Sequence, residues 1–586
     1  MISIKMKKML IVGLVFFFVV LMSITVSTKE GNTLDKDVVS RNIWYVDDDA
    51  VGSNNGLSWE NAFTRLQPAF DSAQSSDEIR VAAGVYIPYA NEDKTDGEKF
   101  DPKKISFELV DGVMLYGGYA GFGAVNPDAR DVMLYETVLT GDLNGDDGSN
   151  FQNYDDNSHH VVLGMDIYNT STLIDGVTIT GGSASASDPL DVFYQRGGGM
   201  YLVRVEVLTI SNCTFLANRA VGAAAGEGGA MHIVSSTSKN LIIRNCLFME
   251  NDASSGGGIY IRYDSTPTII DCEFIENSAG GGGGVTSFVS NPSFIRCQFN
   301  DNTADIYGGG ATVNGGRVTI VECSFEDNAA DERGGGIENS DGNMTLENCW
   351  FASNSAVYGS GIHQYAFTSC YMTLKNCILM NHPGAAIWNW QSSSASPSTM
   401  LSGCTLVNND AGLIDEGEFP TQLKNCIFWG NGEGQEVDQI SGMGITVNYC
   451  CIQGLSGNFG GIGNFGNDPL LVGPSADNYH LSFTSPCIDT GDPEYIPGPD
   501  EKDIDGQPRM IDGTLNGIAI VDIGADEFVS GDLDGDGDID LADLQILLSN
   551  YGMTSGATYE DGDLDGDGDV DLADLQMLLS NYGTGA

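Results

Sequence analysis

Ile210-Ser211-Asn212-Cys213-Thr214-Phe215, followed by Asn218, is one copy of a phrase that returns about every 26 residues. Within the phrase, Cys and Phe are two residues apart and therefore share one face of a short strand. A fixed period built from short strands and turn residues predicts a parallel β-helix, in which each repeat adds one coil to a continuous core. Further copies surround Cys246, Cys272, Cys297, Cys323 and Cys349, and weaker copies surround Cys377, Cys404 and Cys426.

The residue before each cysteine is expected to form a corner between two strands. It is Asn in five copies, Asp271 and Gly403 in two others, and these types tolerate the left-handed backbone conformation. Arg296 and Glu322 do not belong to these types, so we expect a different turn there. A second asparagine row, which starts at Asn218, is expected to mark the next turn.

The thirteen cysteines occur in a chain that begins like an exported protein. Nine of them share one repeat position, where stacking on successive coils holds them farther apart than a disulfide prefers, so we interpret them as buried thiols. Cys370, Cys450 or Cys451, and Cys487 lie outside that row, and any disulfide would involve them.

The chain divides into five segments. Lys5, Lys7 and Lys8 precede an apolar run, which predicts a signal peptide over residues 1–28 and a secreted or cell-surface protein; an uncleaved anchor is the alternative. We expect an N-terminal cap at 41–104, the β-helix at 105–490, a closure segment at 491–529 and a separate module at 531–586. The formal charge of −55 disfavours nucleic acid as a partner.

The C-terminal module contains the strongest chemical motif. Asp532-Leu-Asp534-Gly-Asp536-Gly537-Asp538-Ile-Asp540-Leu-Ala-Asp543 places oxygen donors where a calcium loop needs them, with Gly537 at the sharp bend. The motif is repeated 31 residues later, and an apolar segment with helical spacing follows each copy. We therefore predict two Ca²⁺ sites and a module that folds only with metal. Their predicted metal residues are Asp532, Asp534, Asp536, Asp538, Asp540, Asp543, Asp563, Asp565, Asp567, Asp569, Asp571 and Asp574.

These two loops resemble the duplicated calcium-binding repeats of type I dockerin domains, which attach bacterial polysaccharide-degrading enzymes to cohesin-bearing scaffolds. The resemblance covers about 55 residues and implies a cohesin-like protein partner. Leu541-Ala542 and Leu572-Ala573 stand where type I dockerins usually carry hydroxyl or basic residues. The near-identity of the copies implies a pseudo-two-fold binding surface.

The repeats resemble those of polymorphic outer-membrane adhesins, in which Phe-x-x-Asn alternates with glycine clusters such as Gly228-Gly229-Ala230-Met231. The flanking segments are similar to those of secreted bacterial right-handed β-helix proteins. The resemblance implies an all-β, right-handed parallel β-helix solenoid, followed by a small α-helical, calcium-binding, dockerin-like module.

Recognisable catalytic signatures of pectin-degrading β-helix enzymes are missing from the chain, so a lyase is the less favoured enzyme. Four acids precede the second asparagine on consecutive copies: Glu250, Glu276, Asp301 and Asp327. Stacked one rung apart, their carboxylates would lie near the spacing of glycoside hydrolase pairs or of a cation site. The alternative is a solvated acidic face. Asp142-x-Asn144-x-Asp146 is a third potential calcium loop, without a clear final acid.

Two functions stay open at this point. The leading hypothesis is an exported β-helix that engages, and in one version degrades, a polysaccharide or cell-surface glycan, attached to its assembly through the dockerin-like module. The alternative is a non-catalytic surface adhesin or structural protein. Polymer shortening would favour the enzyme, whereas saturable binding without turnover would favour the adhesin.

Overall fold

The structure is a computed structural model, and it describes residues 41–89, 101–169, 172–186, 190–222, 226–237, 240–392, 397–417, 420–457, 459–473, 478–499, 501–514 and 517–583. The predicted signal peptide at 1–28 and part of the expected cap lie outside these residues. Within them, no helix is both long and apolar enough to cross a bilayer.

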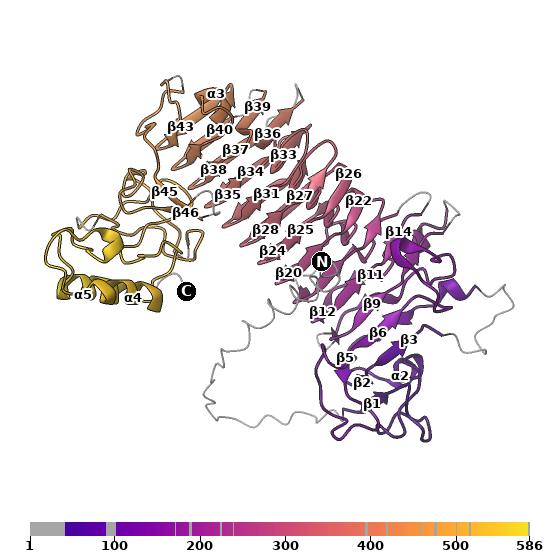
Figure 1. Ribbon diagram of the computed structural model, residues 1–586. Helices are drawn as coiled ribbons and strands as arrows, with labels where there is room; N and C mark the ends of the chain where they lie inside the picture. The colour runs from indigo at the N-terminus through magenta and orange to yellow at the C-terminus, as the bar shows by residue number, and fades with distance from the viewer. Residues whose placement is uncertain are drawn as a thin grey trace, which may run out of the picture. The chain divides into compact units, whose positions relative to one another are not determined.

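One coil illustrates the path of the chain. It runs through β20 (Thr268–Ile270), β21 (Glu273–Ile275), β22 (Ser278–Gly281) and β23 (Val285–Ser290), and β24 (Ser293–Ile295) then starts the next coil. Each strand pairs in parallel with its counterpart one coil later, as β20 does with β24. Repetition of this path builds three long parallel sheets, A, B and C, and a short fourth sheet (Figure 1).

Sheets A and B carry the apolar and Cys-x-Phe parts of the repeat, respectively. Sheet A contains β1 (Ile43–Val46), β2 (Glu78–Ala82), β5 (Met114–Tyr119), β8 (Leu173–Asp175), β12 (Val207–Ser211), β16 (Asn240–Arg244), β20, β24, β27 (Ala311–Val321), β31 (Asn343–Glu347), β34 (Tyr371–Lys375), β37 (Ser398–Ser402), β40 (Thr421–Lys424) and β43 (Ile445–Asn448). Sheet B contains β3 (Gly84–Tyr86), β6 (Thr137–Thr140), β9 (Thr178–Thr180), β13 (Thr214–Leu216), β17 (Leu247–Met249), β21, β25 (Gln298–Asn300), β28 (Ser324–Glu326), β32 (Trp350–Ala352), β35 (Ile378–Met380), β38 (Thr405–Val407), β41 (Ile427–Trp429) and β44 (Cys451–Ile452).

Sheet C and the short sheet follow the second asparagine and the glycine cluster. Sheet C contains β4 (Phe107–Glu108), β7 (Val162–Ile167), β11 (Met200–Val205), β15 (Met231–Val234), β19 (Ile259–Arg262), β23, the first half of β27, β30 (Ile337–Ser340), β33 (Ile362–Ala366), β36 (Ala385–Gln391), β39 (Ala411–Glu416) and β42 (Ile440–Gly442). The short sheet contains β10 (Ser183–Ala184), β14 (Arg219–Ala220), β18 (Asp252–Ala253), β22, β26 (Thr303–Tyr307) and β29 (Ala329–Ala330).

Identical side chains stack along the interior. The phenylalanine rings from Phe215 to Phe351 are buried and nearly parallel, and the ring centroids of Phe299 and Phe325 are 4.4 Å apart. The second asparagine also points inward: the Nδ2 of Asn302 donates to the Oδ1 of Asn328 at 2.9 Å and to the carbonyl of Phe274 at 2.8 Å. This row is therefore a buried hydrogen-bonded ladder, and it satisfies backbone groups that the turns would otherwise leave without partners.

The corner before each cysteine has the predicted conformation. Asn212 and Asp271 both have φ of 52°. The expectation of a different turn at Arg296 and Glu322 is wrong, because their φ values are 50° and 53°. Arg296 is held there by ion pairs, its Nε donating to Asp271 Oδ1 at 2.7 Å. Backbone pairing with the adjacent coils therefore overrides the residue preference at these two corners.

All thirteen cysteines are free and buried, which confirms the interpretation of the repeat cysteines as thiols. Of the two alternatives Cys450 and Cys451, Cys450 belongs to the row and Cys451 lies outside it, because Cys451 pairs in register with Ile427. Cys451 and Cys487 instead lie together in a second buried cluster under the closure segment.

The ends of the β-helix differ from the expected boundaries. Strands β1 and β2 pair in parallel with each other and then with β5, so segment 41–104 contributes the first rungs as well as α2 (Gln67–Ser72). At the other end, β44 is the last parallel rung, and β45 (Leu471–Gly473) and β46 (Asn478–Leu481) pair antiparallel.

The remaining helical elements are short. They are η3 (Pro102–Lys104), η4 (Ser149–Phe151), η5 (Val192–Gln195), α3 (Glu436–Gln439), α4 (Leu541–Asn550), η7 (Tyr559–Asp561) and α5 (Leu572–Asn581). Among the residues that the structure describes, only α4 and α5 are ten residues long, which is nearly three turns, and each directly follows one of the two aspartate-rich loops.

Candidate functional site

The aspartate-rich loops are folded around the first and last carboxylates of each motif. Asp532 accepts hydrogen bonds from the backbone N–H groups of Gly535 (2.7 Å) and Gly537 (3.1 Å). Asp543, which is fully buried, accepts one from Leu533 at 2.7 Å and one from Asp540 at 2.8 Å. In the second loop, Asp563 and Asp574 are equivalent to Asp532 and Asp543 and accept the same backbone hydrogen bonds.

The side chains of each loop converge. One carboxylate oxygen from each of Asp532, Asp534 and Asp536 lies within 4.8 Å of the other two, and the same holds for Asp563, Asp565 and Asp574. Burial raises the pKa of Asp532 to about 6. Hard oxygens gathered in this way are what Ca²⁺ prefers, and a bound ion would oppose the pKa rise, as the neighbouring His480 does in part. Calcium binding at the twelve predicted positions stays a prediction.

The two helices of the module expose matching apolar side chains. Leu541 and Leu548 on α4, and Tyr551 directly after it, are 55%, 51% and 48% exposed. Their equivalents after the second loop, Leu572, Leu579 and Tyr582, are 55%, 51% and 46% exposed. The module therefore presents the same apolar triplet twice.

The turns that carry the four acids of the carboxylate row are stacked on consecutive coils, and the spacing of the carboxylates stays a prediction. Glu250, Glu276, Asp301 and Asp327 occupy left-handed turns with φ between 53° and 55°. The N–H of Glu276 donates to Asn300 O at 3.1 Å and that of Asp301 to Glu326 O at 3.1 Å, which sets the four turns one coil apart. Three of the four side chains are exposed, and their catalytic role stays a prediction.

A cluster of aromatic side chains lies on and beside the neighbouring strands β33 and β36 of sheet C. We call it the aromatic ledge, and it consists of Tyr358, Tyr365, Phe367, Trp388 and Trp390. Tyr365 and Trp390 are register partners on β33 and β36, and their rings stack at 4.6 Å with an interplanar angle of 19°. Phe367 and Tyr358 are 48% and 43% exposed, so the cluster faces solvent.

Buried and partly buried charged groups contact the rings of the ledge. The Nδ1 of His363 lies 2.6 Å from Glu338 Oε2, and both residues are 2% exposed. The guanidinium of Arg333 lies 3.8 Å from the other Glu338 oxygen and 4.5 Å from the centroid of the Tyr365 ring. A similar network lies on earlier coils, where Glu227 pairs with Arg196 and Arg262 at 2.7 Å.

Sequence reasoning missed the ledge because its members are separated by a full coil. The signal was present: when the repeats are aligned in register, Glu338, His363 and Trp388 share one column. Ser340, Tyr365 and Trp390 share another, two residues further along the same face.

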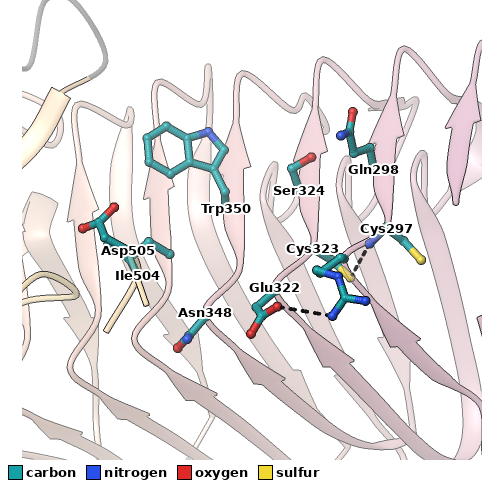
Figure 2. Close-up of a pocket in the computed structure, with 10 residues that line it drawn as sticks. Cys297, Gln298, Glu322, Cys323, Ser324, Asn348, Trp350, Ile504 and Asp505 are labelled. Atoms are coloured by element: carbon teal, nitrogen blue, oxygen red, sulfur yellow. Dashed lines mark hydrogen bonds and ion pairs between the residues drawn. The ribbon is translucent and has the colours of Figure 1, made fainter. Parts of the chain in front are cut away.

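A groove runs between sheet B and the closure segment, and we call it the closure groove. Its larger part has a volume of about 360 Å³. Figure 2 shows Gln298, Ser324 and Trp350 as one row across neighbouring coils, and Glu322 and Asn348 as a second row. Arg296, Cys297, Cys323, Ile504 and Asp505 complete the lining. A second part of about 280 Å³ shares Glu322 and Asn348 and extends to Lys375 and Lys502.

The comparisons with known proteins concern the β-helix. The family model described as "Right handed beta helix region" matches residues 144–286 and 232–411. With the parallel topology above, this shows that the protein is a right-handed parallel β-helix. A search of curated proteins found no match.

Solved structures that are similar to this chain include a pectate lyase and a pectin methylesterase. Pectate lyase Pel9A is 12% identical with a TM-score of 0.36, over 84% of this chain and 98% of that one. Pectin methylesterase from carrot is 13% identical with a TM-score of 0.21, over 70% and 90% of the two chains.

Proposed function

We propose that this protein is exported and binds polysaccharide along the aromatic ledge, while its calcium-folded C-terminal module attaches it to a protein partner. The ledge is the observation that carries the proposal. Sugar rings have apolar faces that pack on aromatic rings, and their hydroxyl groups need polar partners at the edge of the same site. The ledge combines partly exposed rings on neighbouring rungs with Arg333 beside them.

An extended polymer suits this surface. The rings of Tyr365 and Trp390 come from strands that are one rung apart, and rungs of a sheet are about 4.8 Å apart. Tyr358 and Trp388 extend the ledge across the sheet, with ring centroids 5.0 Å apart. A chain of sugars lying over these rings would therefore contact several of them at once.

The test is a binding and chain-length assay on the full-length protein with a panel of neutral and acidic polysaccharides. Replacing the exposed Phe367 and the partly exposed Trp390 in the double variant Phe367→Ala/Trp390→Ala should weaken binding at least about tenfold, because it removes two of the five rings of the ledge. Trp350→Ala, in the closure groove, is the matched control and should bind normally. Loss of binding in Trp350→Ala, but not in the double variant, would indicate that the glycan binds in the closure groove instead of on the ledge.

The same assay separates the enzyme from the adhesin. Shortening of the polymer that is lost in Glu276→Gln/Asp301→Asn would make the protein a glycoside hydrolase acting through the carboxylate row. Saturable binding with unchanged chain length would favour the non-catalytic surface adhesin. No binding to any polysaccharide would overturn the proposal.

The attachment proposal rests on the duplicated apolar triplet of α4 and α5. Exposed leucines and tyrosines that recur in equivalent positions are typical of a binding surface. The partner is a cohesin-like domain in this proposal, and the probe is a set of purified cohesin domains with calcium or chelator. Binding that requires calcium, and that is lost in Leu548→Asp/Leu579→Asp, supports it. Calcium-independent binding, or no binding, contradicts it.

A further inference from the structure

A loop on the first coils of the β-helix gathers oxygen atoms that have no cationic partner. It connects β6 to β7, and its two ends meet where the N–H of Ser158 donates to Gly141 O at 2.8 Å. Asp142, Asp146 and Asp156 each place a carboxylate oxygen within 4.8 Å of the other two. Within the described ranges, none of these three carboxylates forms an ion pair with Lys, Arg or His.

A buried amide beside this cluster supplies an independent observation. Asn157 is 1% exposed, and its Nδ2 donates to Asp147 Oδ2 at 2.8 Å and to Gly181 O at 2.6 Å. The carbonyl oxygen of the same amide, Oδ1, has no hydrogen-bond donor among the described residues. Asp147 Oδ1 and Asp156 Oδ2 are buried without a donor as well. An unsatisfied buried acceptor is destabilising, and these three acceptors belong to one short loop, whose Asp156 is also a member of the carboxylate cluster, so a bound cation would satisfy them.

We propose that residues 142–157 bind one calcium ion, held by the carboxylates of Asp142, Asp146, Asp147 and Asp156 and by the amide oxygen of Asn157. Calcium takes six to eight hard oxygens, including side-chain amides and waters, whereas a site for zinc or copper would use nitrogen or sulfur donors. The buried oxygens without donors are what an ion would coordinate. This site is independent of the two C-terminal loops and of the polysaccharide proposal.

The site would join two coils. Gly181 follows β9 on the next coil, and its carbonyl accepts the hydrogen bond from Asn157. A Cβ at Gly181 would lie 3.1 Å from Asp147 Oδ2, so the absence of a side chain there lets the loop approach. The ion would therefore hold the loop closed against its neighbouring coil and stabilise the N-terminal end of the β-helix.

The experiment uses the full-length chain with the two C-terminal loops disabled by Asp543→Ala/Asp574→Ala. Calcium titration of this background should detect one remaining ion per chain. Adding Asp142→Asn/Asp156→Asn should lower the affinity of that site at least about tenfold, and Asn157→Leu should lower it as well. Asp155→Asn is the matched control, because it removes an exposed neighbouring acid and should leave the affinity unchanged.

Terbium luminescence is a second measurement, and it keeps the proposal testable if the double variant folds poorly. Tyr154 belongs to the same loop, where its ring packs edge-on against Phe151. Because this tyrosine is close in sequence to the proposed ligands, terbium bound in place of calcium should show luminescence sensitised by Tyr154. The luminescence should be displaced by calcium and lost in the milder variant Asp146→Asn, whose side chain is exposed. A background chain that binds no calcium, or binding and luminescence that survive both Asp142→Asn/Asp156→Asn and Asn157→Leu, would overturn the proposal.

Discussion

The β-helix and the C-terminal module both consist of repeats, but the repeats bring together different kinds of side chain. In the central coils of the β-helix each copy buries the same neutral side chains, and Phe, Cys and Asn stack on their own counterparts. In the module each copy instead gathers aspartates, and the buried apolar cluster is small, with Leu547 and Leu578 at its centre. The first kind of repeat stabilises itself through its neighbours, whereas we predict that the second needs a counter-charge from outside the chain.

Chelation of calcium is the largest expected difference between the two regions. Without the ion, the carboxylates of each loop repel one another, and we expect residues 531–586 to unfold while the β-helix stays folded. Limited proteolysis of the full-length chain with and without chelator would show cleavage confined to the module. Asp543→Ala/Asp574→Ala should reproduce that cleavage in the presence of calcium. A module that resists protease equally in chelator would contradict the comparison.

A buried acid gives the β-helix its own sensitivity to pH. Asp415 is 5% exposed on β39, and burial raises its pKa to about 7, although the hydroxyl of Thr421 donates to it at 2.7 Å. Since the folded state holds the proton more tightly than the unfolded state, stability is greatest below about pH 4. It falls as the pH rises to about 7, by roughly 3–4 kcal/mol in total.

The measurement is urea unfolding of the β-helix between pH 5 and 8 at constant calcium. Asp415→Asn should flatten this dependence, because an amide does not titrate. An unchanged pH profile in Asp415→Asn would show that Asp415 is not the group responsible.

The asparagine ladder should contribute somewhat less to the free energy of unfolding than the pH-dependent contribution of Asp415. Asn302→Ala removes two donated bonds and leaves the buried N–H of Asn277 without its acceptor at 3.1 Å. We expect the β-helix to lose about 2–3 kcal/mol, read from the urea midpoint. Gln298→Ala, exposed on the same coil, should change little, and the calcium affinity of the module should not move. Equal losses in both variants would mean that the ladder adds no specific stability.

These contrasts also explain what could be predicted from the sequence. Asp532 and Asp543 lie within one short loop, so their spacing alone predicted which groups converge. The Cys-x-Phe phrase predicted the strands for the same reason, since a two-residue period is local. Arg296 and Glu322 were misjudged because pairing between coils decides their backbone, and residue preference does not.

The parts that could not be predicted depend on register between coils. Trp390 and Tyr365 are 25 residues apart and meet only when the strands align. The first rungs, β1 and β2, lack the repeat phrase, and only their pairing with β5 reveals them. Asn157 is a similar case, because its partner Gly181 belongs to another coil.

The smallest expected effect concerns the thiols. Since every cysteine is free and buried, adding a reductant to the folded protein should leave the urea midpoint of the β-helix unchanged. Cys297→Ser should cost about 1–3 kcal/mol, because a hydroxyl in that row buries a stronger polar group than the thiol it replaces. Cys297→Ala should cost less than Cys297→Ser if the row acts as a small apolar filler. A midpoint that falls with reductant would instead reveal a disulfide, and Cys451 and Cys487, which share one buried cluster, would be the first pair to replace.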